Sequence, residues 1–254
     1  MLKSSEKKLI NRLKLKKFRD QENLFVVEGV KMVQEAIDSG FAVQAIYVQK
    51  EGLISGLIPA TLITEQEMKT VTHFSTPSPA LALVKKAVTS CIQAIPEIDT
   101  SQLYLGLDAI RDPGNMGTIV RIADWFGIKA IFASFDSVDL YNSKVIQASM
   151  GAIFRVPVYY VELSEVIDSL QIPVWGTALC GTSIYETQLS SNGIIIIGNE
   201  SNGISQKLRI KIDKMLLIPS FQNNLVVSES LNVSIATAIV CSEFRRCYYS
   251  NIYR

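Results

Sequence analysis

Two hydrophobic periods alternate along the second part of the chain. Short apolar runs, which are typical of strands, are followed by stretches in which apolar residues recur every three or four positions, which are typical of helices. The strands expected here span 103–108, 129–133, 157–160, 173–178, 194–198 and 214–218. The helices expected between and after them span 116–126, 143–150, 163–169, 204–210 and 231–247. This alternation predicts a mostly parallel sheet covered on both faces, in which Ile194–Ile197 forms a central strand.

The first part of the chain shows a smaller α/β pattern. The helices expected there span 4–15, 30–38 and 65–72, and the strands span 24–29, 45–48, 61–63 and 80–84. A polar, proline-containing stretch at Ile95–Gln102 predicts a linker. We therefore expect two domains, residues 1–95 and 103–254, joined by residues 96–102.

Composition and charge narrow the class of protein. The chain has 254 residues, of which 48% are hydrophobic and 19% charged, which indicates a folded protein with a sizeable core. The net charge is only +1, but Met1–Arg19 holds eight Lys or Arg against one acid, Glu6. Such a basic segment contacts phosphates or forms a solvated helix face, and charge alone leaves both interpretations open.

Cysteine and histidine usage argues against several kinds of site. The four cysteines form no CxxC pair, so we expect no metal site. Cys180 and Cys241 lie in apolar sequence and are expected to be reduced core thiols, and His73 is expected to be structural.

The chain shows no signal-peptide pattern and no apolar run near the ~20 residues of a membrane span, so a cytoplasmic protein without a membrane partner is expected.

Three short polar segments carry the candidate chemistry. They are Asn115–Arg121, Gly198–Gly203 and Ser230–Ser234, and each lies where an apolar run meets a helical pattern. Ligands of a parallel sheet bind outside the carboxyl ends of its strands, so the three segments predict one composite site.

The first segment offers an amide and a cation. Asn115 is a good N-cap candidate for the helix that follows it. Arg121 has apolar neighbours, so it is expected to be paired or to face a cavity. The two open interpretations are an ion pair with Asp124 or Asp108, and a guanidinium that faces a phosphate or a reacting hydroxyl.

The second and third segments add a carboxylate and small polar groups. Gly198 and Gly203 allow positive φ angles and a close backbone approach to a ligand. Glu200 compensates a helix N-terminus or takes part in a site. Ser230 is the expected cap of the last helix, and Asn232 lies in its first turn, where it either caps or serves the site.

In combination, these segments resemble the SpoU-type (TrmH) branch of the SPOUT methyltransferases, over about residues 103–246. That family transfers a methyl group from S-adenosylmethionine to a ribose 2′-hydroxyl of tRNA or rRNA. The resemblance implies a trefoil knot made by the C-terminal helix and a homodimer whose site is completed near the subunit interface. The stretch from Lys17–Arg19 through Phe25–Gly29 is similar to the small RNA-binding domain, itself like certain ribosomal proteins, that often precedes this enzyme.

The resemblance also assigns roles to residues. The catalytic residues it implies are Asn115, Arg121, Glu200, Ser230 and Asn232. The cofactor contacts it implies lie at Thr177, Ala178, Leu179, Gly198, Ile218 and Leu231. The RNA contacts expected in the first domain are Lys16, Lys17 and Arg19. Residues 220–229 form a longer loop than in typical relatives, which puts the methionine end of the cofactor pocket in question.

The mechanism and the substrate stay partly open. Arg121 acts as a base or stabilises the developing alkoxide, and stabilisation is favoured because arginine normally stays protonated. Ribosomal RNA is favoured over tRNA by association with the first domain. The alternatives are an RNA-binding protein that has lost catalysis and an NAD-dependent Rossmann enzyme, which the lack of a G-x-G-x-x-G motif disfavours.

Overall fold

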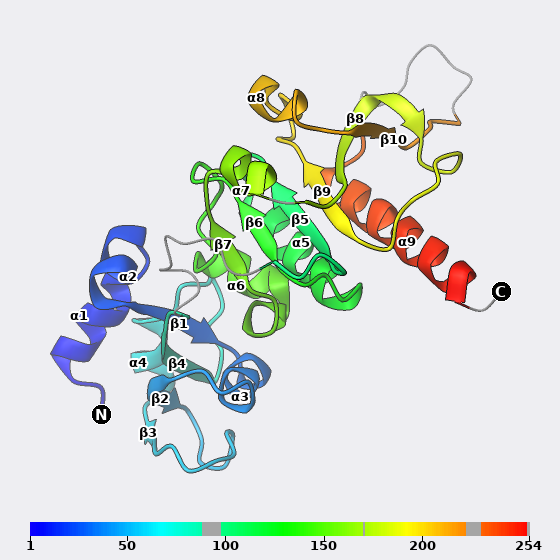
Figure 1. The fold of residues 1–254 in the computed structure, drawn as a ribbon. Helices are drawn as coiled ribbons and strands as arrows, with labels where there is room; N and C mark the ends of the chain where they lie inside the picture. The colour runs from blue at the N-terminus through cyan, green and yellow to red at the C-terminus, as the bar shows by residue number, and fades with distance from the viewer. Residues whose placement is uncertain (88–97, 170, 222–229, 253–254) are drawn as a thin grey trace.

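The structure, a computed structural model, describes residues 1–87, 98–169, 171–221 and 230–252, with side chains described through Tyr248 (Figure 1). The first domain contains a four-stranded sheet of order β1-β4-β2-β3. Its strands are β1 (Leu24–Glu28), β2 (Val43–Val48), β3 (Ala60–Leu62) and β4 (Ala80–Lys85). Its helices are α1 (Ser4–Arg12), α2 (Lys16–Glu22), α3 (Val30–Asp38) and α4 (Glu65–Lys69). The pairs β1·β4 and β2·β4 are antiparallel, whereas β2·β3 is parallel.

Strand β1 shows how this small sheet is covered on both faces. Successive side chains of a strand point to opposite faces. Leu24 and Val26 accordingly join the hydrophobic cluster that contains Ile10 of α1. Phe25 and Val27 join the cluster on the other face, which continues into the second domain.

The helix predicted at residues 4–15 ends earlier than expected, and a second helix follows it. Helix α1 ends at Arg12, and the α2 segment was not predicted. The Nη1 of Arg19 donates to the carbonyl oxygens of Leu13 and Lys14, at 2.9 and 2.8 Å. These carbonyls would otherwise accept the next helical hydrogen bonds, so the side chain of α2 stabilises the break.

The second domain is built on a six-stranded sheet of order β10-β8-β9-β5-β6-β7, in which every neighbouring pair is parallel. Its strands are β5 (Leu103–Leu107), β6 (Ile131–Ala133), β7 (Val158–Tyr160), β8 (Val174–Ser183), β9 (Gly193–Ile197) and β10 (Lys214–Leu217). Its helices are α5 (Pro113–Trp125), α6 (Ser143–Ser149), η2 (Ala152–Phe154), α7 (Leu163–Ser169), α8 (Gln206–Arg209) and α9 (Val233–Ile252). The predicted parallel α/β fold is confirmed.

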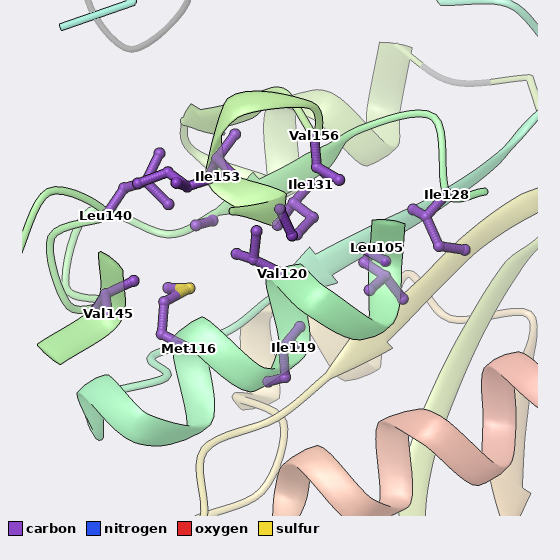
Figure 2. Close-up of a cluster of buried hydrophobic side chains, with 14 of the residues drawn as sticks. Leu105, Met116, Ile119, Val120, Ile128, Ile131, Leu140, Val145, Ile153 and Val156 are labelled. Atoms are coloured by element: carbon purple, nitrogen blue, oxygen red, sulfur yellow. The ribbon is translucent and has the colours of Figure 1, made fainter. Parts of the chain in front are cut away.

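The central strand β9 is buried on both faces, as its apolar run predicts. Ile194 and Ile196 pack in one cluster with residues of α7 and α8. Ile195 and Ile197 pack in the cluster that contains residues of α5, α6 and α9. Figure 2 shows the part of this second cluster in which Met116, Ile119 and Val120 of α5 lie beside Leu105 and Ile131 of the sheet. Strand β9 therefore holds its carboxyl end at a fixed place between the two helical layers.

The two domains share one continuous hydrophobic core. Phe25 of β1 stacks on Tyr141, with ring centroids 4.4 Å apart, and Phe41 meets Phe154 edge-on at 5.1 Å. The first domain lies beside β7 and α6, and β8 and β10 lie at the far end (Figure 1). The domain boundaries expected around residues 96–102 fall partly outside the described residues, and the trefoil knot stays a prediction.

Candidate active site

The loop after β5 is fixed by its neighbours at the carboxyl edge of the sheet. The carboxylate of Asp108 is buried and accepts from the backbone N–H of Ser205 at 2.7 Å. Ala109 has a positive φ of 58°, a costly conformation for alanine. Its N–H donates to Ser134 Oγ at 2.8 Å, and its carbonyl accepts from Asn199 Nδ2 at 2.8 Å. These contacts hold the loop in the conformation that leads into α5.

Helix α5 begins three residues earlier than predicted, which changes the role of Asn115. The N-cap is Asp112, whose Oδ1 accepts from the Asn115 N–H at 2.8 Å, and Pro113 follows at the first helical position. Asn115 is therefore not the cap. Its own amide side chain is left available for contacts outside the helix.

The loop after β9 is a compact turn that carries Glu200. Asn199 and Gly203 exchange backbone hydrogen bonds of 3.0 and 2.9 Å, and the Asn199 side chain accepts from the two N–H groups after Glu200. A Cβ at Gly198 would overlap the Gly203 carbonyl carbon, so only glycine fits there. Gly203 has φ +66°, whereas Gly198 has no positive φ, so the predicted positive φ holds for one glycine of the two.

The start of α9 also differs from the expectation. The helix begins at Val233, and Asn232 caps it, because Asn232 Oδ1 accepts from the N–H groups of Ser234 and Ile235 at 2.9 and 3.3 Å. Ser230, the predicted cap, lies further upstream and is exposed. The capping oxygen of Asn232 is thus engaged, while its amide nitrogen remains free to donate elsewhere.

The three polar segments meet through their side chains. Asn232 Nδ2 donates to Asn115 Oδ1 at 2.9 Å, and Asn115 Nδ2 donates to Glu200 Oε1 at 2.9 Å. Asn199 Nδ2 adds a longer contact of 3.3 Å to Glu200 Oε2. Residues separated by 85 and 117 positions in the chain therefore form one hydrogen-bonded relay, which we call the Asn–Asn–Glu relay. The composite site expected from the sequence exists as a set of contacts.

Arg121 lies apart from this relay. Its side chain is exposed, and among the residues that the structure describes it has no hydrogen-bond or ion-pair partner. The ion pairs considered for it do not form, because Asp124 binds Arg155 at 2.8 Å and Asp108 binds the Ser205 N–H. The ion-pair interpretation of Arg121 is therefore wrong, and its guanidinium is available to a ligand or to another chain.

The expected cofactor residues lie around a break in strand β8. The strand pairs with β9 only up to Gly176, and its pairing with β10 resumes at Thr182. Residues 177–181, which contain Thr177, Ala178 and Leu179, therefore leave the ladder. Thr177 Oγ1 donates to the Ile196 carbonyl at 3.2 Å and ties the excursion to the end of β9.

The surface formed by residues 177–181, Ile218 and Leu231 suits a nucleoside, because it combines apolar side chains with polar backbone groups. The excursion presents backbone groups that have no ladder partner, beside Leu179, whose side chain is 70% exposed. Leu231 is 50% exposed, and Ile218 is half-buried against the core. Apolar side chains with a few polar backbone groups among them are typical of a small-molecule binding site. Residues 222–229 of the predicted long loop lie outside the described residues.

Two residues of the site and one cysteine depart from the sequence interpretation. Asn199 supports the Glu200 turn and the Ala109 carbonyl, a role that its place between Gly198 and Glu200 could have suggested. Asp108, which the sequence suggested only as a partner of Arg121, binds the Ser205 N–H.

One of the two cysteine predictions is wrong. Cys241 is a buried thiol whose pKa is raised to about 12 by burial, but Cys180 is exposed on the excursion and is not a core thiol.

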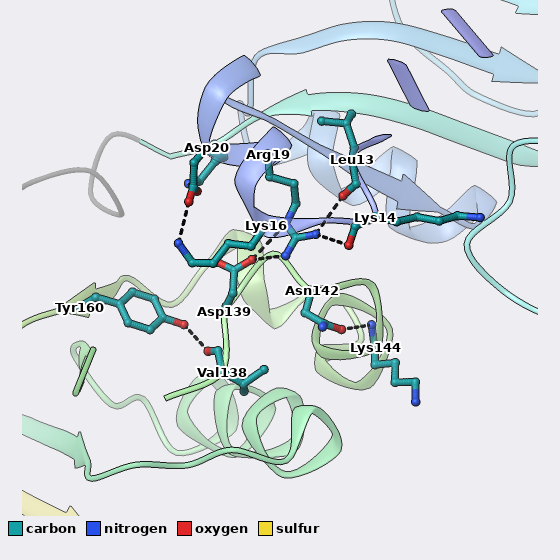
Figure 3. Close-up of polar contacts among 11 residues, drawn as sticks. Leu13, Lys14, Lys16, Arg19, Asp20, Val138, Asp139, Asn142, Lys144 and Tyr160 are labelled. Carbon is teal, nitrogen blue, oxygen red and sulfur yellow. Dashed lines mark hydrogen bonds and ion pairs between the residues drawn. The ribbon is translucent and has the colours of Figure 1, made fainter. Parts of the chain in front are cut away.

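The three basic residues predicted to bind RNA do not share one environment. Lys16 is exposed and pairs with Asp20 at 2.7 Å, and Lys17 is exposed. Arg19 is only 4% exposed, and its guanidinium binds Asp139 of the second domain at 2.6 Å (Figure 3). Arg19 is therefore a bridge between the domains, and the prediction that it contacts RNA does not agree with its burial.

The described residues contain no group of three or more His, Cys, Asp or Glu side chains able to hold a metal ion. Within the same residues, no helix combines the length and the apolar character that a membrane crossing requires. His73 is a structural residue, as expected, because its Nε2 lies 3.0 Å from the Ile10 carbonyl oxygen in the first domain.

Comparisons with known proteins match both domains. Residues 102–242 match the SpoU rRNA Methylase family, and residues 6–82 match the MRM3-like substrate binding domain. The chain is 33% identical, over 92% of its length and 93% of the relative's, to the 23S rRNA (guanosine(2553)-2′-O)-methyltransferase RlmP of Bacillus subtilis.

Solved structures agree with this result. A putative RNA methyltransferase of the TrmH family from Porphyromonas gingivalis superposes with a TM-score of 0.84 at 34% identity, covering 97% of this chain and 99% of that one. The AdoMet-bound rRNA methyltransferase from Sinorhizobium meliloti superposes with a TM-score of 0.82 at 26% identity, covering 97% and 96%.

The fold and the matched sequence define the class of protein, a SPOUT-type methyltransferase that uses S-adenosylmethionine. The chain belongs to the SpoU rRNA Methylase family. The resemblance inferred from the three polar segments is thereby confirmed.

Proposed function

We propose that this chain transfers a methyl group from S-adenosylmethionine to a ribose 2′-hydroxyl of ribosomal RNA, and that the Asn–Asn–Glu relay forms the floor of the reaction site. The observation that carries the proposal is the relay itself, in which Asn232, Asn115 and Glu200 meet at the carboxyl edge of the sheet. A hydrogen-bonded set drawn from three distant segments costs conformational freedom, and stability alone would not require it there.

The excursion at residues 177–181, Gly198, Ile218 and Leu231 would hold the cofactor. When bound, S-adenosylmethionine supplies an electrophilic methyl group on its sulfonium. The exposed Leu179 and Leu231 would cover the base, and the backbone of Gly198, which packs closely on the Gly203 turn, would line the ribose side.

The relay would orient the ribose that accepts the methyl group. Each Asn115 side-chain atom already has a partner, the oxygen with Asn232 and the nitrogen with Glu200, so the amide has one fixed orientation. Glu200, held also by Asn199, would accept a hydrogen bond from a ribose hydroxyl. Ser230 would line the same pocket from the segment before α9. Holding the hydroxyl in line with the methyl group is a large part of such catalysis.

Arg121 would stabilise the developing alkoxide and the adjacent phosphate. Arginine keeps its proton in proteins, so electrostatic stabilisation is the better role for it than general base catalysis. Its exposed position on α5 suits a site that a second copy of the chain completes.

We propose that the second copy packs on the surface formed by α5 and α9. Helix α5 packs against α9, and both expose large apolar side chains, among them Trp125 at 84% exposure and Ile235. Exposed apolar patches of this kind mark protein interfaces. In the homodimer, Arg121 would lie near the partner's relay.

The RNA that this site would accept is 23S rRNA, at a guanosine ribose. The Bacillus subtilis relative, a 23S rRNA guanosine 2′-O-methyltransferase that matches over nearly the whole chain, supports this choice of substrate. Exposed Lys16 and Lys17 on α2 would contact RNA phosphates. A ribosomal RNA substrate also favours a cytoplasmic location.

The decisive experiment separates methyl transfer from cofactor binding. Methylation of 23S rRNA, 16S rRNA and tRNA transcripts would be measured with radiolabelled S-adenosylmethionine, and cofactor affinity by calorimetry. We expect the Arg121→Ala variant to lose about 100-fold in turnover, the typical cost of removing one transition-state donor, with unchanged cofactor affinity. Wild-type turnover in this variant would remove Arg121 from the mechanism, and a wild-type chain that does not bind the cofactor would support the non-catalytic RNA-binding alternative.

A further inference from the structure

The order of strands defines the path that a bound RNA must take. The candidate cofactor residues follow β8, β9 and β10, whereas the first domain lies beside β7 at the other end of the sheet (Figure 1). An RNA held by both would pass over the loops that follow β5 and β6. The β5 loop leads to Asn115, so the β6 loop is the remaining surface on this path.

The β6 loop, residues 134–142, is connected to both ends of the path. Ser134 Oγ accepts from the Ala109 N–H at 2.8 Å, beside the relay. At the other end of the loop, Asp139 binds Arg19 of α2, and Lys14 and Lys144 extend away from this joint in Figure 3. The loop thus links the candidate site with the basic helix of the first domain.

Phe135 is the exposed aromatic residue of this loop. Its side chain is 72% exposed, although its neighbours are fixed on both sides. The Ser134 N–H donates to the Leu107 carbonyl at 2.9 Å, and Ser137 Oγ accepts from the Ile110 N–H at 3.1 Å. A rigid loop therefore presents a phenyl ring to solvent, an arrangement that costs hydrophobic free energy unless a ligand covers the ring.

A cation contacts Asp136, the residue that follows Phe135 in the chain. The Arg111 guanidinium is 3.6 Å from the Asp136 carboxylate, and both side chains are largely exposed. Ser134 Oγ also donates to Asp136 at 2.7 Å, which fixes the carboxylate. An aromatic ring with a neighbouring, weakly paired guanidinium is the combination that proteins use to stack an unpaired base and bind its phosphate.

We propose that Phe135 stacks on an unpaired RNA base next to the methylated nucleotide, and that Arg111 binds the phosphate beside that base. The proposal rests on the proposed function, because it names a substrate-positioning contact of the same site. Phe135 orients the RNA and does not touch the methyl group. Removing the Phe135 ring should therefore raise KM for the RNA and leave the affinity for S-adenosylmethionine unchanged.

The test compares three substitutions at one position in the full-length protein. We expect Phe135→Ala and Phe135→Leu each to raise KM for the RNA about 10-fold, the cost of one lost stacking contact, while Phe135→Trp keeps KM near the wild-type value. Affinity for S-adenosylmethionine should be unchanged in all three. A Phe135→Leu variant with wild-type KM would overturn stacking, since it keeps the apolar volume without the ring. A change in oligomeric state in Phe135→Ala would also overturn the proposal, because the ring would then belong to a subunit contact.

Arg111 provides an independent measurement. In Arg111→Gln, direct RNA binding should weaken, and the dependence of log Kd on log salt should lose about one phosphate contact, whereas Arg111→Lys should keep most of it. An unchanged salt dependence in Arg111→Gln contradicts the phosphate contact. Failure of the proposed function is a separate result, because the wild-type chain would then bind RNA without methylating it.

Discussion

Both sheets of this protein bury apolar side chains on both faces, but the polar side chains around them have different roles. In the first domain, the polar side chains satisfy the fold itself: Glu28 accepts from Thr72 Oγ1 and from the His73 N–H, each at 2.6 Å. In the parallel sheet, the polar side chains of Asn115 and Asn232 instead reach across loops to other segments. A parallel sheet places all of its carboxyl ends at one edge, so distant segments converge there, and a mixed four-stranded sheet offers no such edge.

The first domain therefore positions the substrate, and the second domain carries the reaction site. The domains share a core and are joined by the ion pair of the buried Arg19 with the partly buried Asp139. Any RNA contact on α2 therefore lies at a fixed place relative to the relay. If the two domains behave as one body, a substitution in one of them alters the unfolding of the other.

Removing Arg19 should have the largest effect on stability. Arg19→Ala leaves the Asp139 carboxylate, whose side chain is only 12% exposed, without its partner, and such a loss typically costs about 3–5 kcal/mol of unfolding free energy. The two tryptophans, Trp125 and Trp175, both lie in the second domain, so their fluorescence reports the effect of a change in the first. Urea unfolding followed by this signal should shift to lower denaturant.

The matched control is a double substitution. Arg19→Met with Asp139→Leu removes both charges, and we expect it to regain most of the lost stability. A fluorescence transition unmoved by Arg19→Ala would mean that the domains unfold independently, which contradicts the shared core.

A pH effect should follow from His73. Burial lowers its pKa to about 4, from an ordinary 6.5, because the charged imidazole is disfavoured in the folded chain. The stability linked to His73 is therefore complete above pH 6.5, is lost as pH falls toward 4, and amounts to about 3 kcal/mol in total. The measurement is the difference in unfolding free energy between wild type and His73→Gln across this range. A difference that does not vary with pH would show that His73 is equally accessible in both states.

Breaking the relay at Asn115 should slow catalysis with little effect on the fold. Asn115→Ala removes the hydrogen bond that positions Glu200, and we expect kcat to fall about 10- to 100-fold. Asn232→Ala should lower kcat similarly, and it should also cost about 1 kcal/mol of stability because Asn232 caps α9. Asn115→Asp should be worse than Asn115→Ala, because it places a second carboxylate against Glu200. Cofactor affinity measured in parallel should stay within twofold, and equal losses of affinity and kcat would instead indicate a structural role.

The smallest effect is expected at the exposed bridge between the domains. Arg155 binds Glu35 of the first domain at 3.0 Å and Asp124 of α5 at 2.8 Å, and all three side chains are partly exposed. Arg155→Ala should cost less than about 1 kcal/mol, and high salt should remove the difference. A loss as large as that of Arg19→Ala would contradict the distinction between buried and exposed bridges.

The sequence by itself predicted most of the strands and helices and the class of protein, although it missed α2. Runs such as Ile194–Ile197 can be satisfied only by a strand covered on both faces, and the alternation around them requires helices on each side. The three polar segments identified the family without any coordinates. Local patterns of this kind depend on short-range periodicity, which the chain carries in itself.

The tertiary structure decided which polar group serves which purpose. Asp112 and Asn115 are both good caps. The structure shows that Asp112 caps the helix, since its carboxylate accepts from the Asn115 N–H, and that the Asn115 side chain instead binds Glu200 of a distant loop. Arg19 is one basic residue among eight in its segment, and its burial depends on Asp139, which lies 120 positions away. Long-range partners of this kind decide the role of a polar residue, because a buried charge or amide is stable only where the fold brings its partner to it.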